Sequence, residues 1–521
     1  MTISIKYNKN DELPKLAWVA SFDKSKRYLQ IFHGPAVEYT DTWMVEGVWD
    51  GEFKEGNFHR SENFFGSGVR IEGDTLYFAS STSLDDRLVY CFYENIILVS
   101  NSLIHLLGYT GATLDHHHMY NDCWSIENGI LKYDKEFHIK HKKIKCFYQA
   151  YHRNIVYRDG EMSCEIRSSK KEMNSYQEYI DILKGILVRM RNNYLDKHRM
   201  NPMHPFVTLS TGYDSTAIAV LVKEIGVKDC FISKRSSSNI PWWLSKDASI
   251  DDGGRTAKIL GLYTRYLMKE SFVSKDEIFF LAASWDQFGT IFHSMAEYIE
   301  NNCKTAVVFS GHNGDILWDV NVNKKHLNDE IMPGDLGGLG ASEIRLKSGF
   351  IQISVPYILA RSIESLNKIA HSEEMSHWRL NNSYDRPIPR RIAEEAGIPR
   401  DYFGQRNKAV AKYYYYPKNK HLRKDFFEYI SQYYDLTKGF VYSYIIFNWL
   451  YYVISRLTQY LRFFRKEDAM RSGMRVGATP SKVNPFWPEI NLYHIMFIWA
   501  VNTLSRKISL NFKRFMTTSA G

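Results

Sequence analysis

The chain has 521 residues, of which 44% are hydrophobic and 24% charged, and it has no low-complexity tract. This length predicts two domains, each with its own core, and the composition excludes a small stapled scaffold and extensive disorder. Lysine and arginine (67) exceed aspartate and glutamate (58) by nine, an excess that suits phosphate ligands, anionic partners or a membrane surface without choosing among them.

The cysteine pattern and the apolar segments bear on location. The six cysteines form no CxxC pair and lie far apart, which favours reduced thiols over a disulfide or zinc framework. The first residues carry no secretory signal pattern. The longest apolar stretch, 440–454, is shorter than the roughly 18–20 residues that a membrane span needs. We expect a cytoplasmic protein without a membrane span, with a buried helix at 440–454.

Residues 1 to about 157 carry short segments of alternating hydrophobic and polar residues, such as LAWVASF and LVYCFY, separated by glycine, aspartate and asparagine. This pattern predicts an antiparallel β domain. A polar segment follows at 158–173, and apolar residues at helical spacing then predict a helix within 175–197. We therefore place a first domain at 1–160 and a second at 174–521.

Beyond that helix, short β-like runs alternate with helical segments, a pattern typical of an α/β fold. PFVTL, DCFIS and AVVFS are clear predicted strands. The last third is helical and rich in aromatic residues. The sequence therefore predicts a two-domain protein of α+β and α/β type that ends in helices.

The most informative segment is FVTLSTGYDSTA at 206–217. A predicted strand stops at Ser210, Thr211 and Gly212 and a helix begins at once, so unpaired backbone N–H groups and the helix dipole face one spot. Ser215 adds a hydroxyl donor, and Asp214 could hold a magnesium ion whose other ligands are phosphate oxygens. The alternative is a plain strand-to-helix turn in which Asp214 and Ser215 cap the helix.

A second loop of this kind is AVVFSGHNGD at 306–315. An apolar strand again runs into small residues, Ser310 and Gly311, and presents an aspartate, Asp315. Ligands of open α/β sheets bind beyond the carboxyl ends of the strands. The two loops could therefore share one nucleotide, with Asp214 and Asp315 on its magnesium ion. The first loop is not a Walker A loop, because it lacks GK[ST].

These loops carry a family resemblance. LSTGYDS resembles the SGGxDS pyrophosphate loop of N-type ATP pyrophosphatases, and FSGHNGD resembles the SGEGxDE loop of asparagine synthetases. Two later segments, 354–365 and 390–410, resemble the VPFLD and LR…LP…RxK segments of that family and follow in the same order. Over roughly 205–505 the chain therefore resembles the asparagine-synthetase-like family.

The resemblance implies an α/β PP-loop synthetase domain with a helical C-terminal part, which uses ATP and Mg²⁺. Such enzymes adenylate a carboxylate, release pyrophosphate and let a nitrogen nucleophile attack the acyl-AMP. By resemblance, Lys408 neutralises the α-phosphate in the transition state, although a solvated lysine on a polar turn is the alternative. Asp214 and Asp315 are the implied metal ligands. The implied nucleotide-binding residues are Leu209, Ser210, Thr211, Gly212, Asp214, Ser215, Ser310 and Gly311.

The segment 84–107 resembles part of the family's glutaminase domain, which implies an αββα fold of the N-terminal-nucleophile type for residues 1–160. Glutamine-dependent members expose a catalytic cysteine after the first methionine, whereas this chain has Thr2, and their RLSI and NGE segments are absent. We expect an inactive glutaminase. Ammonia or a substrate amine would then supply the nitrogen, as in β-lactam synthetases and lasso-peptide cyclases.

Two residues of the loops depart from the family pattern. His312 stands where asparagine synthetases have glutamate, and an imidazole with a pKa of about 6.5 is a candidate base for an attacking ammonium or amine. A histidine that donates to a backbone carbonyl is the alternative. Thr211 replaces a glycine and brings a β-branched side chain into a loop that favours positive φ.

The expected acid is a small molecule, a sugar acid or a peptide carboxylate, and aspartate is one candidate. Alternatives from other classes are an ATP-binding scaffold with reduced activity, a tRNA-modifying relative and a membrane-surface protein that uses the aromatic C-terminal helices. The tRNA alternative lacks a paired catalytic cysteine motif, and no nucleic acid partner is expected. The HHHM segment that begins at His116 lacks partner ligands at zinc spacing. The sequence carries no signal for an oligomeric state.

Overall fold

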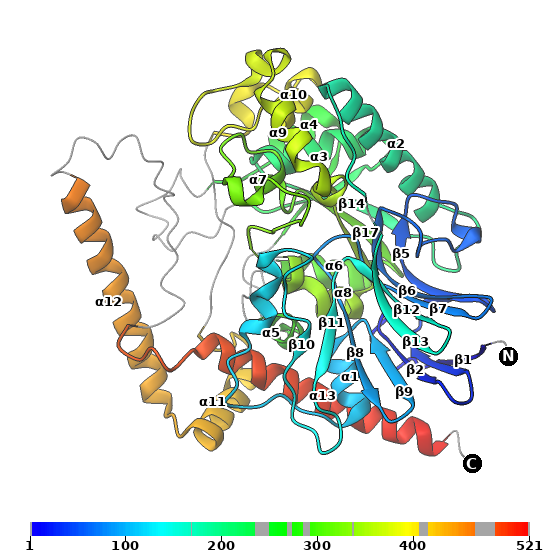
Figure 1. The fold of residues 1–521 in the computed structure, drawn as a ribbon. Coiled ribbons are helices and arrows are strands. Elements are labelled where there is room, and N and C mark those ends of the chain that lie inside the picture. The colour runs from blue at the N-terminus through cyan, green and yellow to red at the C-terminus, as the bar shows by residue number, and fades with distance from the viewer. Residues whose placement is uncertain are drawn as a thin grey trace.

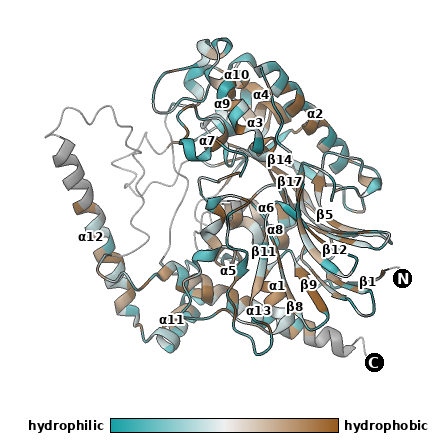
Figure 2. Ribbon diagram, in the orientation of Figure 1, coloured by the Kyte–Doolittle hydropathy of each residue, from teal (hydrophilic) through white to brown (hydrophobic). Residues whose placement is uncertain are grey.

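The computed structural model describes residues 3–167, 169–234, 250–267, 274–284, 292–335, 338–405, 415–463 and 485–518 (Figure 1). Over these residues the chain has a mixed α/β fold built on three sheets. Figure 2 shows hydrophobic residues along the strands of the sheets, where the core clusters lie.

The first sheet has seven strands in the order β1-β3-β2-β9-β8-β11-β10. Its pairs are antiparallel except for the parallel pair of β1 and β3. The strands in chain order are β1 (Ser4–Lys9), β2 (Trp18–Asp23), β3 (Tyr28–His33), β8 (Leu88–Tyr93), β9 (Ile96–Ser100), β10 (Glu136–Phe137) and β11 (Phe147–Ala150).

The second sheet has six antiparallel strands in the order β13-β12-β7-β6-β5-β4. Its faces follow the period of two that the sequence predicts. Alternate residues of the two sheets, such as Trp18 and Phe22 on one and Val69 and Phe78 on the other, share one core. The strands are β4 (Glu38–Tyr39), β5 (Trp43–Trp49), β6 (Phe64–Glu72), β7 (Thr75–Ala79), β12 (Arg153–Arg158) and β13 (Glu161–Ile166).

Helices cover the outer faces of this pair of sheets. Helix α1 (Leu103–Thr110) and the last helix, α13 (Leu492–Thr518), pack together with the outer side of the seven-stranded sheet. They approach so closely that a Cβ at Gly108 would lie 2.8 Å from Cγ2 of Ile508. On the other side, α2 (Tyr176–Tyr194) contacts β5. The C-terminal helix therefore completes a layer of the N-terminal part of the chain.

The third sheet has five parallel strands in the order β16-β15-β14-β17-β18. The strands are β14 (His204–Leu209), β15 (Asp229–Ile232), β16 (Tyr263–Tyr266), β17 (Ala306–Ser310) and β18 (Phe350–Ser354). Numbered along the chain this order is 3-2-1-4-5, the arrangement of a doubly wound sheet.

Helices pack on both faces of the parallel sheet. One face packs against α2, α3 (Tyr213–Glu224), α9 (Ile363–His371) and α10 (Pro387–Glu395). The other face packs against α5 (Glu277–Ala283), α6 (His293–Asn302) and α8 (Ser342–Ser348). The short helices α4 (Gly254–Leu260) and α7 (Gly314–Leu317) follow loops near the strand ends.

The helix predicted at 440–454 is present, but the prediction that it is buried is wrong. After α11 (Lys420–Tyr434), helix α12 (Lys438–Phe463) extends away from the three sheets in Figure 1. Its buried side carries Val441, Tyr444 and Asn448, whereas Ile446, Trp449 and Ile454 are 56%, 59% and 57% exposed. Hydrophobic residues occur on all sides of this helix, but only one side packs against the rest of the described chain. Among the helices of the described residues, none has the length and apolar character that crossing a bilayer requires.

Candidate active site

The two loops singled out by the sequence lie at the carboxyl ends of adjacent parallel strands. β14 pairs with β17, and the chain continues from β14 to β15 on one side and from β17 to β18 on the other. This is the switch point of the sheet, where the connections leave in opposite directions and where ligands of such sheets commonly bind. The loops after Leu209 and Ser310 both open there.

The loop after β14 is held together by its own hydroxyl groups. The Oγ atoms of Ser210 and Ser215 lie 2.9 Å apart, and the backbone N–H of Gly212 donates to Oγ of Ser210 at 3.1 Å. Gly212 is the N-cap of α3, and within the described chain no side chain caps this helix. The N-cap residue is therefore Gly212, not Asp214 or Ser215. The first N–H groups of α3 are available to an anion.

Thr211 joins this loop to two other parts of the chain. Its backbone N–H and its hydroxyl donate to Oδ1 of Asp251 at 3.0 and 2.7 Å, and its carbonyl accepts the N–H of Gly404 at 2.8 Å. Thr211 is not among the residues with positive φ. Its β-branched side chain therefore does not cause the steric strain that a positive φ would bring. The threonine instead anchors the loop.

The second loop packs directly on the first through two glycines. A Cβ at Gly311 would lie 2.8 Å from Cβ of Asp214, and one at Gly314 would lie 2.6 Å from Cγ of the same residue. Both distances are below ordinary contact, so a side chain at either glycine would push the loops apart. The SGHNGD loop therefore needs glycine here in order to bring Asp315 next to Asp214.

Asp214 is the centre of a charged cluster. Its Oδ2 accepts from the buried guanidinium of Arg386, whose Nε lies 3.7 Å from Oδ2 of Asp319. Burial raises the pKa of Asp214 to about 6, and the carboxylate of Asp315 adds to the increase while Arg386 opposes it. Within the described chain, Oδ1 of Asp214 is buried and has no hydrogen-bond partner.

This donor set fits a magnesium ion held mainly by a nucleotide. Asp214 offers an unused carboxylate oxygen, and Asp315 is exposed in the first turn of α7. No group of three or more histidine, cysteine, aspartate or glutamate side chains in the described residues could hold a metal alone. Magnesium commonly takes only one or two protein carboxylates and completes its shell with phosphates and water.

His312 connects the second loop to the N-terminal part of the chain. Its Nδ1 lies 2.9 Å from Oδ1 of Asp85 and its Nε2 lies 3.3 Å from Oδ1 of Asp335. Burial lowers the pKa of His312, but the hydrogen bonds to Asp335 and Asp85 outweigh burial and raise it well above the usual value. An imidazolium donates protons rather than accepting them. The geometry therefore gives His312 a bridging role between carboxylates and argues against the predicted role as a base.

A chain of hydroxyls extends this contact into the sheet. The hydroxyls of Ser310 and Ser354 lie 2.9 Å apart, and Ser354 donates to Asp85. Asp85 is thus hydrogen-bonded to both His312 and Ser354 although it lies far from either in sequence. The end of β17 and the end of β18 are fixed by a residue of the N-terminal part.

The structure gathers most of the predicted site residues at the carboxyl ends of β14 and β17. Lys408 and Thr2 lie outside the described residues. The residues brought together there are Leu209, Ser210, Thr211, Gly212, Asp214, Ser215, Ser310, Gly311, His312 and Asp315.

Sequence reasoning missed Arg386, Asp251 and Asp85 as parts of this site. Asp85 stands within the segment 84–107 that carries part of the resemblance, but nothing local marks Asp85 or Asp251 as a partner of the loops. Arg386 is 172 residues from Asp214 and has no motif of its own. Only the packing of α10 on α3 brings it there.

No protein-family model matches the chain, and a comparison with curated proteins finds no match either.

Proposed function

We propose that this chain is an ATP-dependent, AMP-forming amide ligase of the asparagine-synthetase type. It would adenylate a carboxylate and then transfer ammonia or a substrate amine to the acyl group. The observation that carries the proposal is the packing of two glycine-dependent loops at the switch point, which brings Asp214 and Asp315 together at the N-terminus of α3. In this proposal the parallel sheet and its helices form the PP-loop synthetase domain.

The loop after β14 is suited to pyrophosphate. The hydroxyls of Ser210 and Ser215 and the first N–H groups of α3 all lie at one end of the helix, so they can donate to the β- and γ-phosphates. A phosphate there needs close backbone approach, which Gly212 allows. Leu209, Ser310 and Gly311 would line the nucleoside on the strand side.

Asp214 and Asp315 would hold Mg²⁺, which supplies positive charge to the phosphates of ATP. In the described structure Arg386 provides the positive charge beside Asp214. If Asp214 held the ion, the guanidinium of Arg386 would be placed to pair with a phosphate oxygen, since arginine suits phosphate geometry. Lys408 is proposed to stabilise the α-phosphate, the position where charge develops during adenylation.

Two stacked sheets between helical layers support a glutaminase-like αββα unit for the N-terminal part. Thr2 replaces the nucleophilic cysteine, so we propose free ammonia or a substrate amine as nitrogen donor, with ring closure as in β-lactam synthetases or lasso-peptide cyclases as the alternative. All six cysteines are free, which supports a cytoplasmic location. His312 and Asp85 would hold this unit against the second loop.

The proposal is tested by the products formed from MgATP. The protein is incubated with ammonium and, in turn, aspartate, sugar acids and peptides that carry carboxylates, and AMP and pyrophosphate are quantified. We expect equal amounts of AMP and pyrophosphate with one class of acid, and a loss of at least a hundredfold in Asp214→Asn and Lys408→Ala.

Asp181→Asn is the matched control, because Asp181 is exposed on α2, where its carboxylate accepts a hydrogen bond from the side chain of Gln177. It should keep full activity. If no acid gives AMP and ATP does not raise the melting temperature of the wild type, the ligase proposal fails. If ATP raises the melting temperature but no AMP forms, the chain is an ATP-binding scaffold.

A further inference from the structure

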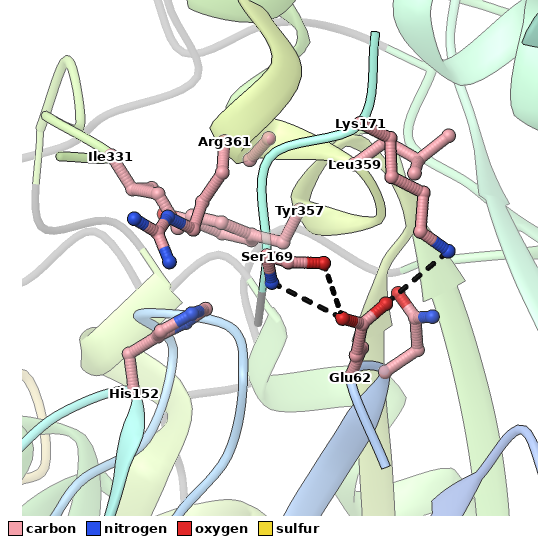
Figure 3. Close-up of a pocket in the computed structure, with 10 residues that line it drawn as sticks. Glu62, His152, Ser169, Lys171, Ile331, Tyr357, Leu359 and Arg361 are labelled. Carbon is pink, nitrogen blue, oxygen red and sulfur yellow. Dashed lines mark hydrogen bonds and ion pairs between the residues drawn. The ribbon is translucent and has the colours of Figure 1, made fainter. Parts of the chain in front are cut away.

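Figure 3 shows a pocket between the N-terminal part of the chain and the turn after β18. Its enclosed space is about 20 Å³, room for about one water molecule. Its charges are paired within the chain, since Glu62 lies 3.2 Å from Nζ of Lys171 and Arg361 donates to Asp329 at 2.6 Å. This pocket is no ligand site. The strongest unexplained feature of the described chain lies instead on the surface of α12.

One broad side of α12 exposes large apolar side chains to solvent. They recur every three or four residues, so they share a side of the helix. Val441, Tyr444 and Asn448, which are buried, lie on the opposite side. We call the exposed set the outer face. Its members, between 39% and 59% exposed, are Tyr442, Ile446, Phe447, Trp449, Leu450 and Ile454.

The buried side of α12 holds the outer face outward. Tyr444 stacks on Trp487, with ring centres 6.1 Å apart, and its hydroxyl donates to the carbonyl of Ile490 at 3.1 Å. The side-chain amide of Asn448 donates to the hydroxyl of Tyr415 at 2.7 Å. Figure 1 shows the helix extending away from the three sheets. The orientation of the outer face is therefore fixed by packing.

The composition of the outer face suits the boundary of a lipid bilayer. Residues 439–455 contain no charged residue, and no aspartate or glutamate occurs from 436 to 466. Trp449 and Tyr442 each combine an apolar ring with a polar group, the kind of side chain that gathers at the level of lipid headgroups. A cluster of exposed apolar side chains on one element usually marks an interaction site.

Positive charge is concentrated in the same part of the sequence. Residues 438–521 contain 12 lysines and arginines and three aspartates and glutamates, a net charge of +9. This equals the net charge of the whole chain, so the first 437 residues sum to zero. Lys438, at the start of α12, and Arg506 and Lys507, on α13, are exposed. An anionic surface would therefore attract the end of the chain that carries the outer face.

Charge separates a bilayer from other partners. A second copy of the chain would bring two segments of net charge +9 together, which opposes association through this face. Nucleic acid is bound through lysine and arginine contacts to phosphates, and residues 439–455 contain neither. An apolar helix face with basic residues beside it is the pattern of helices that lie in a membrane interface.

The outer face is too short to cross a bilayer. From Tyr442 to Ile454 the helix rises about 18 Å, whereas the hydrocarbon core of a bilayer is about 30 Å thick. The helix would therefore lie along the surface.

We propose that the outer face of α12 binds the surface of an anionic lipid bilayer, with its apolar side chains among the headgroups and the basic residues of 438–521 near the lipid charges. Binding needs neither ATP, magnesium nor an acid substrate, so it is independent of the proposed ligase activity.

The test is flotation of the purified full chain, without nucleotide, with two kinds of vesicle. One is phosphatidylcholine alone, and the other is phosphatidylcholine and phosphatidylserine in a two-to-one ratio. The protein floats with the anionic vesicles and binds the neutral ones at least tenfold more weakly. Raising the ionic strength from about 0.1 M to about 1 M, which shortens the Debye length from about 10 Å to about 3 Å, weakens binding to the anionic vesicles.

The variant Ile446→Ser with Trp449→Ser removes two of the most exposed apolar side chains of the outer face. It weakens binding to the anionic vesicles at least tenfold, since each lost side chain removes apolar surface from the lipid contact. Its melting temperature stays that of the wild type. Leu131→Ser with Met200→Ser is the matched control, because these residues are 50% and 52% exposed elsewhere on the chain. This control binds as the wild type does.

The proposal is overturned if the wild type does not float with anionic vesicles, or if it floats equally well with neutral ones. It is also overturned if the outer-face variant floats as the wild type does, because charge alone would then explain binding, or if the control loses binding to the same extent. A wild type that does not float but forms a dimer that the outer-face variant dissociates would make this face a contact between copies. None of these outcomes depends on AMP formation, which tests the ligase separately.

Discussion

Asp214 is fixed by contacts from two other parts of the chain. Gly311 and Gly314 press on it from the second loop, and Arg386 pairs with it from the start of α10. The two loops could be predicted from the sequence because each is a contiguous strand-loop-helix pattern. Arg386 could not, because its partnership with Asp214 depends on how two helices pack, and no local pattern encodes that.

The glycine contacts give a prediction about packing. Gly314→Ala should lower the free energy of unfolding by about 1–3 kcal/mol, the usual cost of forcing an extra methyl into a filled space, and should weaken MgATP binding because the loops separate. Urea denaturation and calorimetry measure the two effects.

The matched control is Gly185→Ala in α2, where a Cβ would meet only Nη1 of Arg189, at 3.5 Å. This change should leave MgATP binding alone and stabilise the helix by about 0.5–1 kcal/mol. Equal effects of the two substitutions on MgATP binding would contradict the packing of the loops described above.

His312 gives a prediction about pH. Its folded-state pKa is raised well above that of an exposed histidine, which is about 6.5. The stabilisation is therefore fully present below pH 6.5 and is lost as pH rises through the folded-state pKa. The stability advantage of wild type over His312→Gln, measured by urea denaturation, should shrink steadily as pH rises above 6.5. An advantage that stays constant up to pH 9 would show that the ring is neutral.

At the scale of elements, the positions of the strands can be predicted from the sequence, whereas the strand that each one pairs with cannot. Alternating segments predict the strands β2 and β8, and the apolar runs before the two loops predict β14 and β17. The order of strands in the sheets depends on long-range pairing and does not follow from alternation. Helix α12 was misjudged because hydrophobic content alone does not say whether another element covers a surface.

The contact between β5 and α8 depends on a buried ionic cluster. Arg345 donates to Glu46 at 2.8 and 3.2 Å and to Asp86 at 2.6 Å, and all three side chains are buried. Removing one partner of such a cluster leaves charges without compensation.

Arg345→Leu should therefore lower the free energy of unfolding by about 3–5 kcal/mol. The control is Lys184→Met, which breaks an exposed pair with Glu224 and should cost at most about 1 kcal/mol. Denaturation in urea checks both variants, and a loss for Arg345→Leu no larger than that of the control would contradict a structural role for the cluster.

At the scale of the whole molecule, the two parts of the chain hold each other in place. The backbone N–H of Leu114 donates to the side chain of Asn502, 388 residues away, and α13 lies on α1. Asp85, in the N-terminal part, contacts His312 in the loop after β17. A division of the sequence into two consecutive domains does not show that the C-terminal helix packs on the N-terminal part. This packing arises from side chains that meet only in the folded protein.

The central claim is that an acyl-AMP forms before nitrogen attacks. It is tested most directly by the exchange of labelled pyrophosphate into ATP with magnesium and acid but no ammonium or amine. The account predicts exchange that needs the acid, proceeds without the nitrogen donor and disappears in Asp214→Asn. Absence of exchange with every acid, together with release of ADP and phosphate rather than AMP and pyrophosphate, would contradict it.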